Sequence, residues 1–170
     1  EAYYQYDFNK PADNNRPGFI YSHNRHNEFN LNLGFLKGSY NAERVRANLA
    51  LAAGTYMNAN YAAETGVLKN IFEANAGLKI SKKRNLWIDA GIFTSHIGFE
   101  SAISKDCWVL TRSILAENSP YFEAGIKIIY SSNNNKWVAT GLLLNGWQRI
   151  KRVAGNSAMS YGTQLQYKPN

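Results

Sequence analysis

The feature that most constrains the fold is an alternation of large apolar residues with polar or small ones. In residues 28–35, every second residue is large and apolar, and the residues between them are polar or glycine. Successive side chains of a β-strand point to opposite faces, so this period of two predicts strands with one apolar and one polar face. No convincing helical period occurs outside the loop regions. The sequence therefore predicts an all-β fold.

The strands are expected to form an antiparallel meander of about eight members. The expected strands are residues 2–8, 28–35, 44–51, 72–80, 86–93, 122–130, 136–145 and 159–168. Short connections at 36–39, 81–85 and 131–135 alternate strictly with long ones at 9–27, 54–70, 95–119 and 146–156. Short turns at one end and long loops at the other are typical of an outer-membrane barrel. The strand lengths also approach the roughly 9–11 residues that a tilted membrane-spanning strand needs.

Composition excludes several classes of protein. Hydrophobic residues make up 45% of the chain and charged residues 18%, which argues against disorder. No apolar run approaches the roughly 18 residues of a transmembrane helix, whereas transmembrane strands are only half apolar and remain allowed. The single cysteine, Cys107, permits no internal disulfide. The length suits one domain over residues 1–170, and a start at Glu1 without Met is expected if a secretory signal was removed.

The content of the polar face favours a membrane barrel over a soluble barrel or sandwich, which would show the same alternation. This face combines charged residues with Gly, Ala and Asn. Glycine weakens a solvent-facing strand, but in a polar lumen small residues leave room for opposite charges to pair. We therefore predict a transmembrane β-barrel whose pore is lined by Glu28, Arg44, Arg46, Glu73, Lys79, Asp89, Glu123 and Lys127.

The long loop 95–119 is expected to fold inward and constrict the lumen through Glu100, Arg112 and Glu117. A net charge of +7 favours a mild preference for anions among small hydrophilic solutes. The other expected partners are outer-membrane lipid and lipopolysaccharide. The phosphates of lipopolysaccharide could bind the basic loop residues 16–26. The sequence leaves open whether the chain forms a homo-oligomer or a membrane complex. Nucleic acid is not expected, because the basic triplet 82–84 falls in a tight turn.

No signature of catalysis is present. The chain contains no GxSxG, Walker A or GxGxxG motif. His23 and His26 have no cysteine or carboxylate pair at metal-ligand spacing. We expect no enzyme activity, no metal and no cofactor.

Several short motifs resemble a known family. In order along the chain they are Gly91-Ile92-Phe93, Ile97-Gly98-Phe99-Glu100, Thr111-Arg112-Ser113, Pro120 and Gly125. Their order is similar to that of the OmpL-like porin-2 β-barrel family of Bacteroidetes-type outer membranes. The resemblance implies an integral barrel of the bacterial outer membrane that passes small solutes, and it implies neither a substrate nor catalytic residues.

Two departures from the family affect the mechanism. The chain ends Tyr167-Lys168-Pro169-Asn170, without the terminal aromatic of an outer-membrane barrel, and family members look longer. We therefore expect these residues to be the amino-terminal half of a larger barrel. Eight strands enclose only side chains, whereas about 16 leave an aqueous channel. The alternatives to a porin are a closed eight-stranded structural, adhesive or ligand-binding barrel without a pore, and a soluble ligand-binding β domain.

Overall fold

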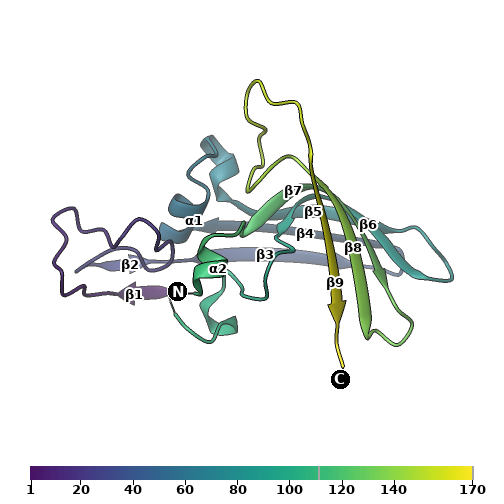
Figure 1. Cartoon of the computed structure of the whole chain (residues 1–170), viewed down its shortest axis with the longest axis horizontal. Helices are drawn as coiled ribbons and strands as arrows, with labels where there is room; N and C mark the ends of the chain where they lie inside the picture. Colours follow the sequence, from purple (N-terminus) through teal and green to yellow (C-terminus); the bar gives the residue numbers. More distant parts are fainter. Residues whose placement is uncertain (111, 170) are drawn as a thin grey trace.

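The main element is a seven-stranded antiparallel sheet (Figure 1). The computed structural model describes residues 1–110 and 112–169. Each strand of the sheet pairs with the next one in sequence, which confirms the predicted all-β meander. In order, the strands are β3 (Gly34–Asn41), β4 (Val45–Ala53), β5 (Ile71–Lys79), β6 (Asn85–Thr94), β7 (Phe122–Ser131), β8 (Trp137–Leu144) and β9 (Ser160–Tyr167).

The amino-terminal part differs from the prediction. The expected strands 2–8 and 28–35 supply only β1 (Ala2–Tyr4) and β2 (Phe29–Leu31), which form a separate two-stranded sheet. The predicted turn at 36–39 is wrong, because these residues lie inside β3 and the chain turns at 42–44 instead. Pairing with the nine residues of β4 outweighs the local turn preference of Gly38 and Ser39. In the described residues the meander therefore has seven strands, against the eight or so that were predicted.

The alternation of long and short connections is confirmed within this sheet. Short turns at 42–44, 80–84 and 132–136 lie at one end, and long connections at 54–70, 95–121 and 145–159 lie at the other (Figure 1). Where the long connections are described, their regular structure consists of short helices: α1 (Thr55–Asn60), η1 (Gly66–Asn70), η2 (Ser104–Asp106) and α2 (Ile114–Glu117). Among the described residues, none of the helices has the length and apolar character needed to cross a membrane.

The sheet is open, with β3 and β9 at its edges. Within the described residues, β3 pairs only with β4 and β9 only with β8. Each edge therefore presents backbone N–H and C=O groups that have no partner strand. In a hydrocarbon environment each such unpaired group costs several kcal/mol. If the sheet forms the wall of a membrane barrel, further strands must therefore pair with both of its edges.

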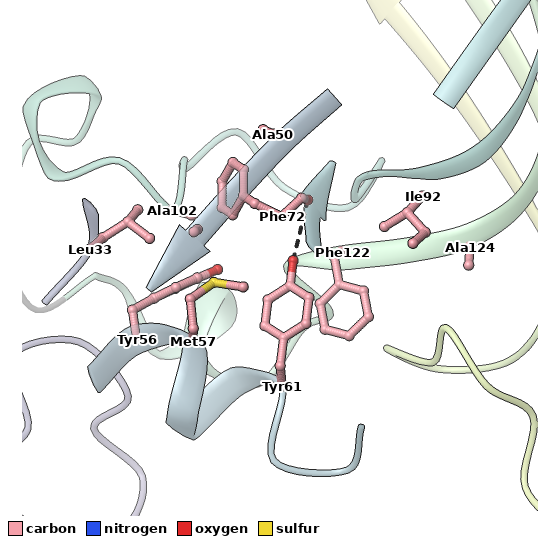
Figure 2. Packing of buried hydrophobic residues seen from close by; sticks show 11 residues of the cluster. Leu33, Ala50, Tyr56, Met57, Tyr61, Phe72, Ile92, Ala102, Phe122 and Ala124 are labelled. Atoms are coloured by element: carbon pink, nitrogen blue, oxygen red, sulfur yellow. Dashed lines mark hydrogen bonds between the residues drawn. The ribbon is translucent and has the colours of Figure 1, made fainter. Parts of the chain in front are cut away.

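A buried cluster fixes the long loops to their end of the sheet (Figure 2). The Tyr61 ring stacks on Phe122 with 3.9 Å between centroids and 10° between planes, and the Tyr61 hydroxyl donates to the Phe72 carbonyl at 3.4 Å. Tyr56 and Met57 of α1 join the same cluster and are almost completely buried. The loops therefore pack into one platform on the sheet.

Loss of the Phe122 ring should detach this platform. Replacing Phe122, which is 2% exposed, with Ala should lower the free energy of unfolding by about 3–5 kcal/mol through loss of buried area and a residual cavity. The same substitution at Phe29, which is 88% exposed, should change it little. Thermal unfolding in detergent measures both variants. Equal losses at the two positions would show that Phe122 does not anchor the platform.

Candidate functional site

The strand register gathers the predicted charged residues on one side of the sheet, here called the polar face. Arg46 pairs with Gly77, Gly77 with Asp89, and Asp89 with Lys127, so these four residues form one row across β4, β5, β6 and β7. Side chains in one row point to the same face. Glu73 on β5 and Glu123 on β7 each lie four residues from a member of the row and share its face.

An ion pair crosses the middle of this row. Arg46 donates from Nε to Asp89 Oδ1 at 2.8 Å and from Nη2 to Asp89 Oδ2 at 2.6 Å. The guanidinium also lies 4.3 Å above the centre of the Trp87 ring. A Cβ at Gly77 would stand 1.9 Å from Asp89 Oδ1, so the ion pair occupies the space that glycine leaves free. This confirms that a glycine on the polar face gives opposite charges room to pair.

A second ion pair joins β3 to β5. Lys37 Nζ lies 2.5 Å from Glu73 Oε2, and Asn75 donates to Glu73 Oε1 at 3.1 Å. Asn48 continues the polar network by donating to Asn75 Oδ1 at 3.2 Å. The sequence prediction missed Lys37 because it placed this residue in a turn. The length of β4 was the available signal, since a partner strand of equal length has to include residue 37.

Other charged groups of this face are Lys127, in the same row, and Glu123 and His96, which lie nearer the long loops. Lys127 Nζ is 4.3 Å above the Phe93 ring. His96 Nδ1 lies 3.4 Å from the buried Glu123 Oε2, and the His96 carbonyl accepts a hydrogen bond from Gln164 on β9. His96 was not predicted, since nothing in its local sequence shows that it meets β7 and β9.

Three predicted pore residues lie away from this network. Arg44 is in the 42–44 turn and its Nη2 donates to the Lys79 carbonyl at 3.4 Å, at the short-turn end of the sheet. The placement of Glu28 in a strand of the wall is wrong. Glu28 precedes β2, outside the seven-stranded sheet, and its Oε1 accepts from Arg25 Nε at 2.8 Å. The separate pairing of β1 with β2 removes this segment from the sheet.

The loop 95–121 borders a cavity on the polar face. The cavity has a volume of about 710 Å3 and is lined by residues of β3, β5 and β9 as well as by the loop. Lys37 and Glu73 line it from the wall, Glu100 lines it from the loop, and Gln166 lines it from β9. The loop therefore borders the same cavity as both edge strands, β3 and β9.

The three charged loop residues have different surroundings. The buried Arg112 donates to the carbonyls of Ser101 at 2.9 Å, Ala102 at 3.0 Å and Leu110 at 2.8 Å, so its guanidinium holds the loop together. Glu100 accepts from the Ser113 backbone N–H and hydroxyl. Thr111, beside Arg112 in the family motif, lies outside the described residues.

Glu117 is not brought together with Glu100 at the main cavity. It lines a smaller cavity of about 340 Å3 between the long loops, together with Tyr21 and Trp147. Burial raises the pKa of Glu117 to about 7, because desolvation disfavours the carboxylate.

The opposite side of the sheet, here called the apolar face, exposes large hydrophobic side chains. Leu36 is 81% exposed and Tyr161 is 83% exposed. Other exposed members on this side include Tyr40, Leu49, Leu51, Leu78, Ile126, Ile128, Trp137, Leu165 and Tyr167. Such a continuous apolar surface is unusual for a protein surrounded by water and fits contact with lipid.

A long-stranded antiparallel sheet whose apolar face is exposed and whose opposite face carries paired charges is typical of the class of β-barrel membrane proteins. The comparison of the chain with known families agrees. Residues 1–170 match the model of the family described as "Putative beta-barrel porin-2, OmpL-like", and the chain belongs to this family. Membership gives the chain a porin-type role, implies the outer membrane and suggests that the role is not enzymatic. No curated protein and no solved structure matches the chain.

A comparison with another strand glycine tests whether the Arg46–Asp89 ion pair needs the space beside Gly77. Gly77→Ala should lower the free energy of unfolding by about 1–3 kcal/mol, because the new methyl group displaces the Arg46–Asp89 ion pair. Gly38→Ala should be neutral or slightly stabilising, since a Cβ there meets nothing within 4 Å. Chemical denaturation of both variants measures the difference. If the two substitutions have equal effects, the ion pair does not depend on the missing side chain.

The surroundings of Glu117 predict a pH dependence. Its pKa is raised from 4.5 to about 7 in the folded protein, so the folded state binds the proton more tightly than the unfolded state. The contribution of Glu117 to stability should be largest below pH 4.5 and should fall as the pH rises to about 7. Glu117→Gln should remove this decline, and Glu43→Gln in the exposed 42–44 turn should not. Thermal unfolding of the three proteins from pH 4 to 8 tests this, and parallel curves would contradict it.

Proposed function

We propose that the chain forms part of the wall of an outer-membrane porin that lets small hydrophilic solutes diffuse passively through a polar lumen. The observation that carries this proposal is the opposition of the two faces of one sheet. The row through Arg46, Asp89 and Lys127 supplies a charged, hydrogen-bonding surface, and the reverse side exposes large apolar residues. Such a sheet would place its apolar face against lipid and its polar face in a water-filled lumen.

The lumen would be lined by Arg46, Glu73, Asp89, Glu123 and Lys127, with Arg44 and Lys79 at its short-turn rim. Charges of both signs along this wall create a transverse field that orders water and charged solutes without selecting strongly for one sign. The net charge of +7 gives the pore a mild preference for anions.

The open edges of β3 and β9 support a larger barrel, of which this sheet is an arc. Further antiparallel strands would pair with both edges, whether they come from a longer polypeptide or from another copy of the chain. A barrel of roughly 16 strands would leave a water-filled channel. Intact mass spectrometry of the mature protein from its native cell distinguishes the two sources, since only a longer polypeptide gives a mass well above 19.1 kDa.

The loop 95–121 would act as the constriction, because it borders the same cavity on the polar face as both edge strands. Glu100 is the charged loop residue at this cavity. Arg112 would act indirectly by holding the loop carbonyls in place. The signal peptide would be removed before the protein inserts into the outer membrane. The basic loop residues 16–26 would then bind the phosphates of lipopolysaccharide.

Conductance in planar lipid bilayers tests the proposal. The protein should form open, ohmic channels, and exchanging Arg44 and Arg46 for Glu should shift the reversal potential in a KCl gradient toward cation selectivity. Lys82→Glu, at the exposed tip of the 80–84 turn, makes the same change of charge as Arg44→Glu alone and should shift the reversal potential less than that single variant. Arg44→Glu alone covers the case in which the loss of Arg46 prevents folding. An unchanged reversal potential would remove the arginines from the pore lining, and the absence of conductance would contradict the porin role.

A further inference from the structure

The cavity between loop 95–121 and the wall combines an aromatic surface with paired charges, and we infer that it is a binding subsite for a neutral carbohydrate. This inference rests on the proposed function and names the class of solute that would pause at the constriction. The cavity volume of about 710 Å3 lies within the range of about 300–1,000 Å3 that is common for small-molecule sites.

Two phenylalanines form a flat apolar surface on the wall side of the cavity. The rings of Phe35 and Phe72 stack with 5.5 Å between centroids and 12° between planes. Both rings line the cavity, and Phe35, which is 42% exposed, offers more surface than Phe72, which is 7% exposed. The C–H face of a sugar ring packs on such an aromatic ring. From the loop, Phe99 and Tyr121 add further aromatic surface to the lining.

The ionisable side chains around this aromatic surface are arranged for hydrogen bonding to a neutral solute. Two lysines and two glutamates line the cavity, and their formal charges cancel. Lys37 is paired with Glu73 at 2.5 Å, and Glu100 accepts hydrogen bonds from the backbone N–H and hydroxyl of Ser113. A lining without net formal charge attracts free ions weakly but still offers donors and acceptors to hydroxyl groups.

The amide of Gln166 adds a donor and an acceptor from the opposite edge strand. Hydrogen-bonding groups therefore approach the cavity from β3, β5, β9 and the loop, while the Phe35 ring lies on one wall. A solute with a flat apolar face and a rim of hydroxyls satisfies both parts of this lining. Inorganic ions would leave the aromatic part unused, and purely apolar solutes would leave the polar part without partners.

Titration calorimetry with maltotriose tests the subsite in detergent-solubilised protein, where binding does not require a conducting pore. The protein should bind maltotriose, and Phe35→Leu should weaken binding by about tenfold, because it keeps an apolar side chain but loses the flat ring. Phe35→Tyr retains the ring and should bind like the unmodified protein. Phe29→Leu is the matched control, since Phe29 lies outside the cavity and is 88% exposed.

Bilayer recordings with the same sugar separate this inference from the proposed function. Maltotriose should reduce the channel current reversibly, with a half-saturating concentration that rises in Phe35→Leu. Open channels together with no binding of maltotriose would overturn the subsite and leave the porin role intact. Binding that depends on Phe35 without any conductance would support the subsite and overturn the porin role. Binding that Phe35→Leu leaves unchanged would overturn the assignment to this cavity.

Discussion

The structure depends on the pairing of backbone groups between neighbouring strands. In a hydrocarbon environment water cannot satisfy N–H and C=O groups, so every spanning strand needs a partner on each side. The continuous pairing from β3 to β9 meets this requirement for the interior of the sheet. The same pairing fixes the register, and the register decides that Arg46, Asp89 and Lys127 share one face. The polar and apolar faces of the sheet follow from this register, and in the described part of the chain only the outer edges of β3 and β9 do not meet the requirement for a partner.

Small residues make the polar face possible. Bidentate pairing of Arg46 with Asp89 needs the empty space at Gly77, and the Asn48–Asn75 contact beside it satisfies polar groups without adding charge. The long loops are stabilised by other interactions. The Tyr61 ring stacks on a neighbouring aromatic ring, and the Arg112 guanidinium donates hydrogen bonds to backbone carbonyls. The charges of the wall therefore pair with one another across strands, whereas Arg112 binds backbone carbonyls of its own loop.

Alternation predicted β4 to β7 and β9 and the shared face of Arg46 and Asp89, because a period of two follows directly from strand geometry. The strand at β8 was also expected, but its run of apolar residues did not show which face is which. It failed at β3, where pairing with β4 overrides the turn preference of Gly38 and Ser39. It also missed Lys37 and His96, whose partners lie far away in the sequence. Loop residues are the hardest to predict, since the same arginine in the sequence could face solutes or, like Arg112, bind backbone carbonyls.

The central claim is that the two faces of the sheet meet different solvents. A nitroxide scan along β4, from position 46 to 51 in a Cys107→Ser background and in lipid vesicles, measures this directly. Collisions with oxygen should be frequent at 47, 49 and 51, and collisions with a water-soluble nickel complex should be frequent at 46 and 48. This alternation would show that the apolar face lies in lipid and the polar face in water. Equal access of the nickel complex to both sets would contradict a membrane-spanning wall.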